Sequence, residues 1–159
     1  MIRLALVLSL AAGQAAALSC LPADVVRTYK QVDADDAPWG AAVGRLDFDE
    51  SRLPVVDWDR QGEVPPETEI RGQMVGHSLT PEGWNRPFQH AVTVRVLCFG
   101  PWCPSPRSGA TYLAFVKREN GRSIIIADPC GSMLFPNPTQ QDMDRLQSCF
   151  AGGPCDEGR

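Results

Sequence analysis

The sequence has few of the residues and motifs that catalytic and cofactor sites require. It holds only two histidines, His77 and His90, and their positions lack the repeated spacing that metal ligands show. It has neither the Gly-x-Ser-x-Gly turn of hydrolases nor a glycine-rich loop that would cradle a phosphate group. These absences predict a protein that is not an enzyme, with no catalytic residues, no metal and no cofactor.

The acidic residues do not form a recognisable ion site either. Asp57-Trp-Asp59 has two carboxylates at calcium-ligand spacing, but the rest of the EF-hand pattern is missing. The carboxylates at 33–36 and 47–50 are interpreted as solvated faces. The four tryptophans are interpreted as core or edge packing, which is the usual place of such side chains, and a binding surface is the alternative.

Basic residues are scattered and no basic run is present. The chain has 15 Lys and Arg against 19 Asp and Glu, which gives a formal net charge of −4. Proteins that bind nucleic acid normally present a basic patch. We therefore expect no nucleic-acid partner but a protein partner, whose identity the sequence does not give.

The sequence has no long apolar segment, and a short apolar run lies at its N-terminus. Arg3 is followed by the apolar run Leu4–Leu10 and then by small residues at Ala15–Ala17. A positive charge, a short apolar run and small residues in this order are typical of a secretory signal peptide. We predict a signal peptide over residues 1–17, cleaved before Leu18.

Cleavage before Cys20 is the alternative, because small residues also stand at Ala17 and Ser19. A cysteine at the new N-terminus would suggest a lipid-anchored envelope protein, although the order Ala17-Leu18 is the reverse of a lipobox. No later segment has the length of a membrane span. We predict a single domain over residues 18–159 that is secreted or periplasmic.

All six cysteines lie after the predicted signal peptide. An even number of cysteines in an exported chain indicates disulfides, here three, and six cysteines allow fifteen pairings. The spacing of the last two is interpreted as an anchor for a C-terminal helix, and the other pairings stay open. The six residues are Cys20, Cys98, Cys103, Cys130, Cys149 and Cys155.

The segment Cys98-Phe-Gly-Pro-Trp-Cys103 differs from a redox motif. Thiol–disulfide oxidoreductases use Cys-x-x-Cys in a βαβ context, whereas four residues separate these cysteines and Pro-Ser-Pro follows them. Cys130 has no close neighbour that would complete a zinc site with this pair. We predict that Cys98 and Cys103 are oxidised and structural, and that they anchor a loop between two central strands.

Alternating apolar residues and turn signals predict a mainly β chain with a helix near each end. Gly72 and Gly76 interrupt one strand, which is typical of bulges or barrel corners. Because no strand–helix–strand alternation is present, the pattern favours a small closed antiparallel barrel. The expected helices are 19–33, capped by Ser19, and 140–150, capped by Thr139; the expected strands are 41–48, 68–79, 91–99, 111–117 and 123–127, with a hairpin turn at Asn120-Gly121 and a candidate short strand at 55–58.

The second half of the chain resembles a known family. A Pro/Ser loop leads to Gly109 and to the segment YLAF at Tyr112–Phe115, an apolar strand leads to Cys130, and PTQQDMDRLQSC occupies Pro138–Cys149. This order resembles the netrin-like module of tissue inhibitors of metalloproteinases, netrins and complement proteins. Val43-Gly-Arg-Leu46 is similar to the family's Gly-Arg-Val segment. The segment LCFGPWC is also similar in style to exported bacterial proteins.

The resemblance covers roughly residues 20–155 and implies an OB-type barrel of five strands, flanked by helices and stapled by disulfides. It implies that Cys20 is the family's first cysteine and pairs with the loop that contains Cys98 and Cys103. In metalloproteinase inhibitors the α-amine and carbonyl of this first cysteine chelate the zinc of the protease. The family opens with Cys-x-Cys, whereas this chain reads Cys20-Leu-Pro.

The expected function is therefore an exported, disulfide-stabilised binding module without catalytic activity. Inhibition of a metalloprotease through an N-terminal Cys20 is one alternative. A lipid-anchored envelope protein is the other.

Overall fold

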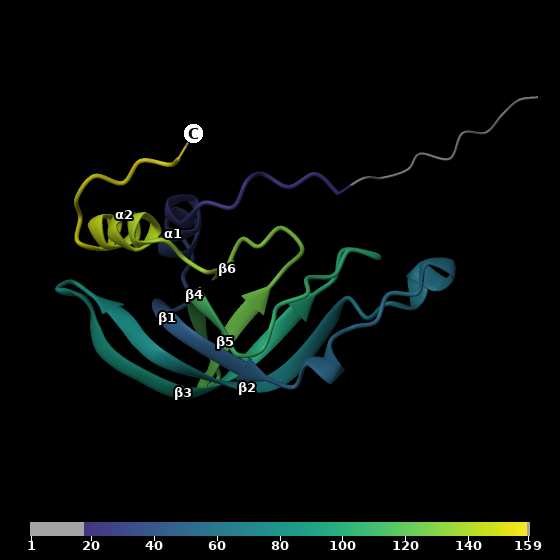
Figure 1. Cartoon of the computed structure of the whole chain (residues 1–159). Coiled ribbons are helices and arrows are strands. Elements are labelled where there is room, and N and C mark those ends of the chain that lie inside the picture. The colour runs from purple at the N-terminus through teal and green to yellow at the C-terminus, as the bar shows by residue number, and fades with distance from the viewer. Residues whose placement is uncertain (1–17, 159) are drawn as a thin grey trace, which may run out of the picture.

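The structure is a computed structural model that describes residues 18–158. The predicted signal peptide, residues 1–17, lies outside the described residues. Six strands and two α-helices follow in the order shown in Figure 1. The elements are α1 (Val25–Asp33), β1 (Trp39–Phe48), the 3₁₀ turns η1 (Glu50–Arg52) and η2 (Trp58–Glu63), β2 (Glu67–Thr80), β3 (Gly83–Leu97), β4 (Ala110–Glu119), β5 (Arg122–Ala127), β6 (Leu134–Pro136) and α2 (Gln140–Phe150).

The strands form one sheet in the order β1-β2-β3-β5-β4-β6, and β1 also pairs with β4. Five strands are therefore connected in a ring of pairings, and β6 adds to β4. The prediction of a mainly β chain with a helix near each end is confirmed. The prediction of a wholly antiparallel sheet is wrong, because β5 turns back beside β4 and meets β3 in parallel, from Thr93↔Ile124 to Val96↔Ala127.

Most element boundaries lie within a few residues of the predicted ones, with four differences. Strand β3 begins at Gly83, because residues 83–90 extend a long hairpin with β2 and only Pro81-Glu82 turn. Strand β6 was not predicted, because its three residues are too few to show the alternation of apolar and polar residues. Residues 55–57 form no strand, since Asp57 caps the turn η2. Helix α1 begins at Val25 and is capped by Asp24, whereas Leu21 of the predicted helix is exposed.

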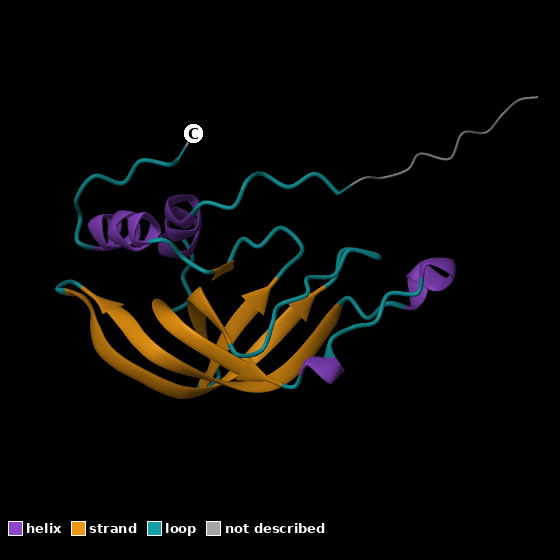
Figure 2. Ribbon diagram, viewed as in Figure 1, coloured by secondary structure: helices purple, strands orange, loops and turns teal. Residues whose placement is uncertain are grey.

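The core has two parts on the two faces of β4. Tyr112, Ala114 and Val116 face the inside of the ring, where they pack with residues from the other four ring strands. Leu113 and Phe115 face the opposite way, toward α1 and α2. A strand buried on both faces shows a continuous apolar run, as YLAFV does at Tyr112–Val116. Figure 2 shows both helices on the same side of the sheet.

Two glycines bring β1 and β2 close together. Gly44 lies opposite Gly76, and a Cβ atom on Gly44 would lie 2.8 Å from the Cα atom of Gly76. The register stays regular from Ala42↔Ser78 to Phe48↔Gly72, so of the two predicted alternatives, bulges or barrel corners, the bulges are wrong. These glycines allow close approach of the two backbones instead.

Three disulfides are present, and two of them have the predicted roles. Cys98 is joined to Cys103 within the connection between β3 and β4, and Cys149 of α2 is joined to Cys155. The pairing of Cys20 that the resemblance implies is wrong, because Cys20 is joined to Cys130. This disulfide places the residues before α1 beside the β5–β6 connection, and α1 itself contacts the same connection, because the Thr28 hydroxyl donates to the carbonyl of Ser132 at 2.5 Å.

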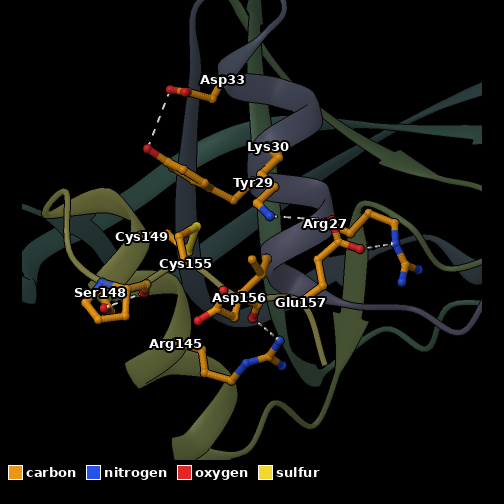
Figure 3. The surroundings of a disulfide bond; sticks show 12 residues. Arg27, Tyr29, Lys30, Asp33, Arg145, Ser148, Cys149, Cys155, Asp156 and Glu157 are labelled. Atoms are coloured by element: carbon orange, nitrogen blue, oxygen red, sulfur yellow. Dashed lines mark hydrogen bonds and ion pairs between the residues drawn. A yellow bond between two sulfur atoms is a disulfide. The ribbon is translucent and has the colours of Figure 1, made fainter. Parts of the chain in front are cut away.

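The C-terminal tail, residues 151–158, is held against α1. Beyond the Cys149–Cys155 disulfide, the guanidinium of Arg145 donates to the Asp156 carbonyl at 3.1 Å. Glu157 forms an ion pair with Arg27 at 3.0 Å (Figure 3). The tail therefore connects the two helices across their surface.

Asp24 joins both helices and the tail. One carboxylate oxygen accepts hydrogen bonds from the backbone N–H groups of Val26 and Arg27, and the other accepts from Arg145 and from the N–H of Gly158. Burial of Asp24 raises its pKa, but these hydrogen bonds and the charge of Arg145 lower it, and the pKa falls from 3.8 to about 2. The charged form is therefore the one that the fold stabilises.

Replacement of Asp24 by asparagine is expected to lower the free energy of unfolding by about 2 kcal/mol at pH 7, because the charge is lost while an oxygen acceptor stays. The folded pKa of Asp24 lies below its ordinary value. The stabilisation is therefore present above about pH 4 and is lost as the pH falls to about 2. Urea titrations of both proteins at pH 7 and pH 2 measure this. An undiminished difference at pH 2 would contradict the role of the charge.

Candidate functional site

Three connections between strands leave the same end of the sheet, and the N-terminal segment lies at this end as well (Figure 1). We name this region the loop end and define it by residues 18–24, 49–66, 98–109 and 128–133. It contains four of the predicted site cysteines, Cys20, Cys98, Cys103 and Cys130. The other two, Cys149 and Cys155, lie with α2 and the tail.

Hydrogen bonds fix the β3–β4 connection against the β1–β2 connection. The N–H of Cys98 donates to the carbonyl of Pro66 at 2.9 Å. The N–H of Ser108 donates to the carboxylate of Glu50 at 2.6 Å, and the Ser108 hydroxyl accepts from the N–H of Phe48 at 2.9 Å. Both ends of the β1–β2 connection are therefore held by the same neighbouring loop.

The β3–β4 connection also borders the β5–β6 connection. The two line a hollow of about 310 Å³ in which several prolines meet. The hydroxyl of Tyr112 accepts from the N–H of Arg107 at 2.7 Å, which holds one wall. The carboxylate of Asp128 accepts from the N–H groups of Cys130 and Ser132, which holds the other.

The N-terminal segment completes the loop end. Cys20 is itself exposed, and its disulfide to Cys130 ties residues 18–24 to the β5–β6 connection. The adjacent Leu21 is 72% exposed. The β1–β2, β3–β4 and β5–β6 connections and the N-terminal segment thus form a continuous series, in this order, in which each contacts the next.

The loop end carries most of the exposed large apolar side chains. Within residues 18–158, such side chains are Leu21, Val55, Trp58, Val75, Phe99 and Phe150, and four of the six lie at the loop end. Val55 and Trp58 are 86% and 63% exposed and share the β1–β2 connection, which projects furthest from the sheet (Figure 1). Single exposed apolar residues are common, whereas several on adjoining loops favour an interaction surface.

Polar groups at the loop end have structural partners. The hydroxyl and N–H of Ser51 hold the pKa of Asp49 below its ordinary value, because they donate to its carboxylate at the start of η1. Arg60 pairs with Asp57 and Glu63 around η2. These contacts shape the turns that carry the apolar side chains.

The residues that metal or thiol chemistry requires do not come together in the described part of the chain. Over residues 18–158, no three His, Cys, Asp or Glu side chains form a group that would hold a metal ion. All six cysteines are in disulfides. His77 and His90 lie on β2 and β3, and His90 packs edge-on against Phe88 at 4.7 Å between ring centroids.

No family model, curated protein or solved structure matches this chain. Its own residues carry the functional argument. No helix in residues 18–158 has the length and apolar character that crossing a membrane requires.

Trp58 lies at the surface, although core or edge packing was expected for all four tryptophans. Trp39, Trp84 and Trp102 are partly buried, as expected, but Trp58 points into solvent. The signal that identifies it is local: Pro54, Gly62 and Pro65-Pro66 break every regular element around it. A tryptophan between such breaks has no strand or helix to pack it into the core.

Proposed function

We propose that this protein is an exported, disulfide-stabilised binding module without catalytic activity, and that the loop end binds a protein partner. The observation that carries the proposal is the set Leu21, Val55, Trp58 and Phe99, exposed on loops that disulfides and hydrogen bonds hold in place. Binding to fixed loops costs less conformational entropy than binding to mobile ones. Tryptophan is also among the residues that contribute most at protein interfaces.

The ring of five strands supports the further proposal of an OB-type barrel of the netrin-like kind. The order β1-β2-β3-β5-β4, closed by the β1–β4 pairing, is compatible with a five-stranded barrel. Three disulfides are typical of proteins in oxidising compartments and support export. The OB-type barrel and the export of the protein both belong to what we propose.

A photo-reactive amino acid at position 58 tests the loop end. In the cells that make the protein, we expect it to cross-link to one specific partner. The same amino acid at position 75, on the outer face of β2, is the matched control, because Val75 is also exposed, at 44%. Equal cross-linking of one partner at both positions, or none at position 58, would contradict the proposal.

The purified partner then allows a quantitative test. Trp58→Ala is expected to weaken binding by tenfold or more, because a central tryptophan at an interface contributes about 2 kcal/mol or more. Val75→Ala is expected to leave the dissociation constant unchanged. Titration calorimetry gives both values, and an unchanged dissociation constant for Trp58→Ala would exclude this residue from the interface.

Metalloprotease inhibition is the second candidate, and the exposure of Cys20 at the rim of the loop end favours it. The intact mass of the exported chain separates the alternatives. A chain that begins at Leu18 excludes zinc chelation by Cys20, and an acylated Cys20 indicates a lipid anchor. If the chain begins at an unmodified Cys20, it should inhibit a metalloprotease, and a variant that retains Ser19 should not.

A further inference from the structure

A groove lies at the opposite end of the ring strands from the loop end. One hollow, of about 290 Å³, lies between the start of β1 and the β2–β3 hairpin. A second, of about 440 Å³, lies between β3 and the β4–β5 hairpin. His90 and Arg118 line both hollows, so the two adjoin at these residues, and we treat them together as one groove.

The groove exists because the strands diverge there. β1 and β2 pair only from Ala42↔Ser78 onward, and β3 and β5 only from Thr93↔Ile124 onward. Before Thr93, β3 has a strand neighbour on the β2 side alone within the described chain. Residues 89–91 on this edge are exposed, so the free backbone edge of β3 faces solvent.

The lining of the groove is cationic and contains no carboxylate. Its charged and titratable residues are Arg71, Arg86, His90, Arg118 and Arg122, and neither hollow is lined by an aspartate or a glutamate. We name it the arginine groove. The chain as a whole has a formal net charge of −4, so the positive charge of the groove is a local feature.

Three of these arginines are not neutralised by neighbours. Within residues 18–158, the Lys and Arg side chains without an ion pair are Arg52, Arg71, Arg86 and Arg118. All but Arg52 line the groove. Arg122 differs, because Glu69 lies 2.8 Å from its guanidinium.

The guanidinium of Arg118 is positioned by an uncharged neighbour. One of its nitrogens donates to the hydroxyl of Ser123 at 2.9 Å, a neutral contact that leaves the positive charge uncompensated. Guanidinium groups bind carboxylates through paired hydrogen bonds. A cleft lined by charge of one sign also concentrates its field on a bound counter-charge.

We propose that the arginine groove binds an extended acidic segment of a partner polypeptide, alongside the edge of β3 at residues 88–92. The charge of the lining selects carboxylate side chains. The unpaired strand edge favours a polypeptide over other polyanions, because only a polypeptide supplies N–H and C=O groups to extend a sheet. Pro87, which has no N–H, limits this edge on its N-terminal side. The proposal concerns a second site and does not depend on the loop end.

A fluorescent octapeptide of alternating glutamate and valine is the probe. Fluorescence anisotropy at low salt should show saturable binding that weakens as salt is added. The double variant Arg71→Gln/Arg118→Gln should weaken binding at least tenfold. Arg52→Gln is the control that removes an unpaired arginine elsewhere, and it should change binding less than twofold. Hydrogen exchange should show that the bound peptide protects those amides of residues 88–92 that face away from β2.

Three results would overturn the proposal. The first concerns the single variants Arg71→Gln and Arg118→Gln. If Arg52→Gln weakens peptide binding as much as each of them does, the peptide is held by unspecific charge attraction. Another is binding without protection of residues 88–92. The third is failure of the peptide where a heparin oligosaccharide or polyphosphate binds with the same dependence on Arg118, which would assign the groove to a polyanion of another class. Because position 58 lies at the other end of the strands, none of these results changes the cross-linking expected there.

Discussion

Replacement of both Cys20 and Cys130 by alanine is expected to lower the free energy of unfolding by about 4–5 kcal/mol. This disulfide closes a loop with a sequence separation of 110 residues, so its removal gives the unfolded chain the largest gain in conformational freedom. It also releases residues 18–24 from the β5–β6 connection. Urea titrations of the oxidised proteins at pH 7 measure the difference.

The matched control is the double alanine variant of Cys98 and Cys103. Their sequence separation is 5, so the same argument gives a loss of about 2 kcal/mol. Alanine suits this pair because Cys98 is buried and a serine hydroxyl there would lack a partner. If loss of the Cys20–Cys130 disulfide costs no more than this control, loop closure does not determine its contribution.

Replacement of Gly44 by valine is expected to destabilise the fold by about 3 kcal/mol or more, or to prevent folding. A Cβ atom at this position would lie 2.8 Å from the backbone Cα of Gly76 and in conflict with the carbonyl of Val75. Backbone atoms cannot move aside as a flexible side chain does. The β1–β2 pairing would have to separate, and the ring of pairings depends on it.

Gly40→Val on the same strand is the control for this experiment. No heavy atom lies within 4 Å of a Cβ atom built on Gly40, so its replacement tests the loss of glycine alone. Valine also has a high strand propensity. Thermal unfolding followed by circular dichroism should show a much lower midpoint for Gly44→Val than for Gly40→Val. Similar midpoints would mean that β1 and β2 separate at little cost.

The sequence predicts this fold best where the signal is local. Asn120-Gly121 is the β4–β5 turn, with positive φ angles of 50° and 77°, and Thr139 caps α2 as expected. Val92, Val94, Val96 and Cys98 alternate in the sequence of the predicted strand 91–99, and all four are buried. Each of these features depends on a few consecutive residues, through the two-residue alternation of a strand or the residue preferences of turns and helix caps.

Features that depend on distant residues could not be predicted in the same way. The partner of Cys20 is set by where the β5–β6 connection crosses the N-terminal segment, and no spacing encodes this. The parallel β3–β5 pairing follows from closing the ring through β4. The arginine groove brings together Arg71, Arg86 and Arg118 from three strands. Its positive charge also requires that no carboxylate lines it, and this depends on where the whole fold places the acidic side chains.

The ring closure has a consequence for the order of events during synthesis. Trp39 of β1 pairs with Lys117 of β4, so the growing chain has to reach β4 before β1 gains its second neighbour. Cys98 and Cys103 are made almost together, whereas Cys20 waits for Cys130. Contacts between residues far apart in sequence form slowly. Cys20 therefore stays a free thiol until residue 130 has been made, and during that interval other cysteines of the same chain can react with it.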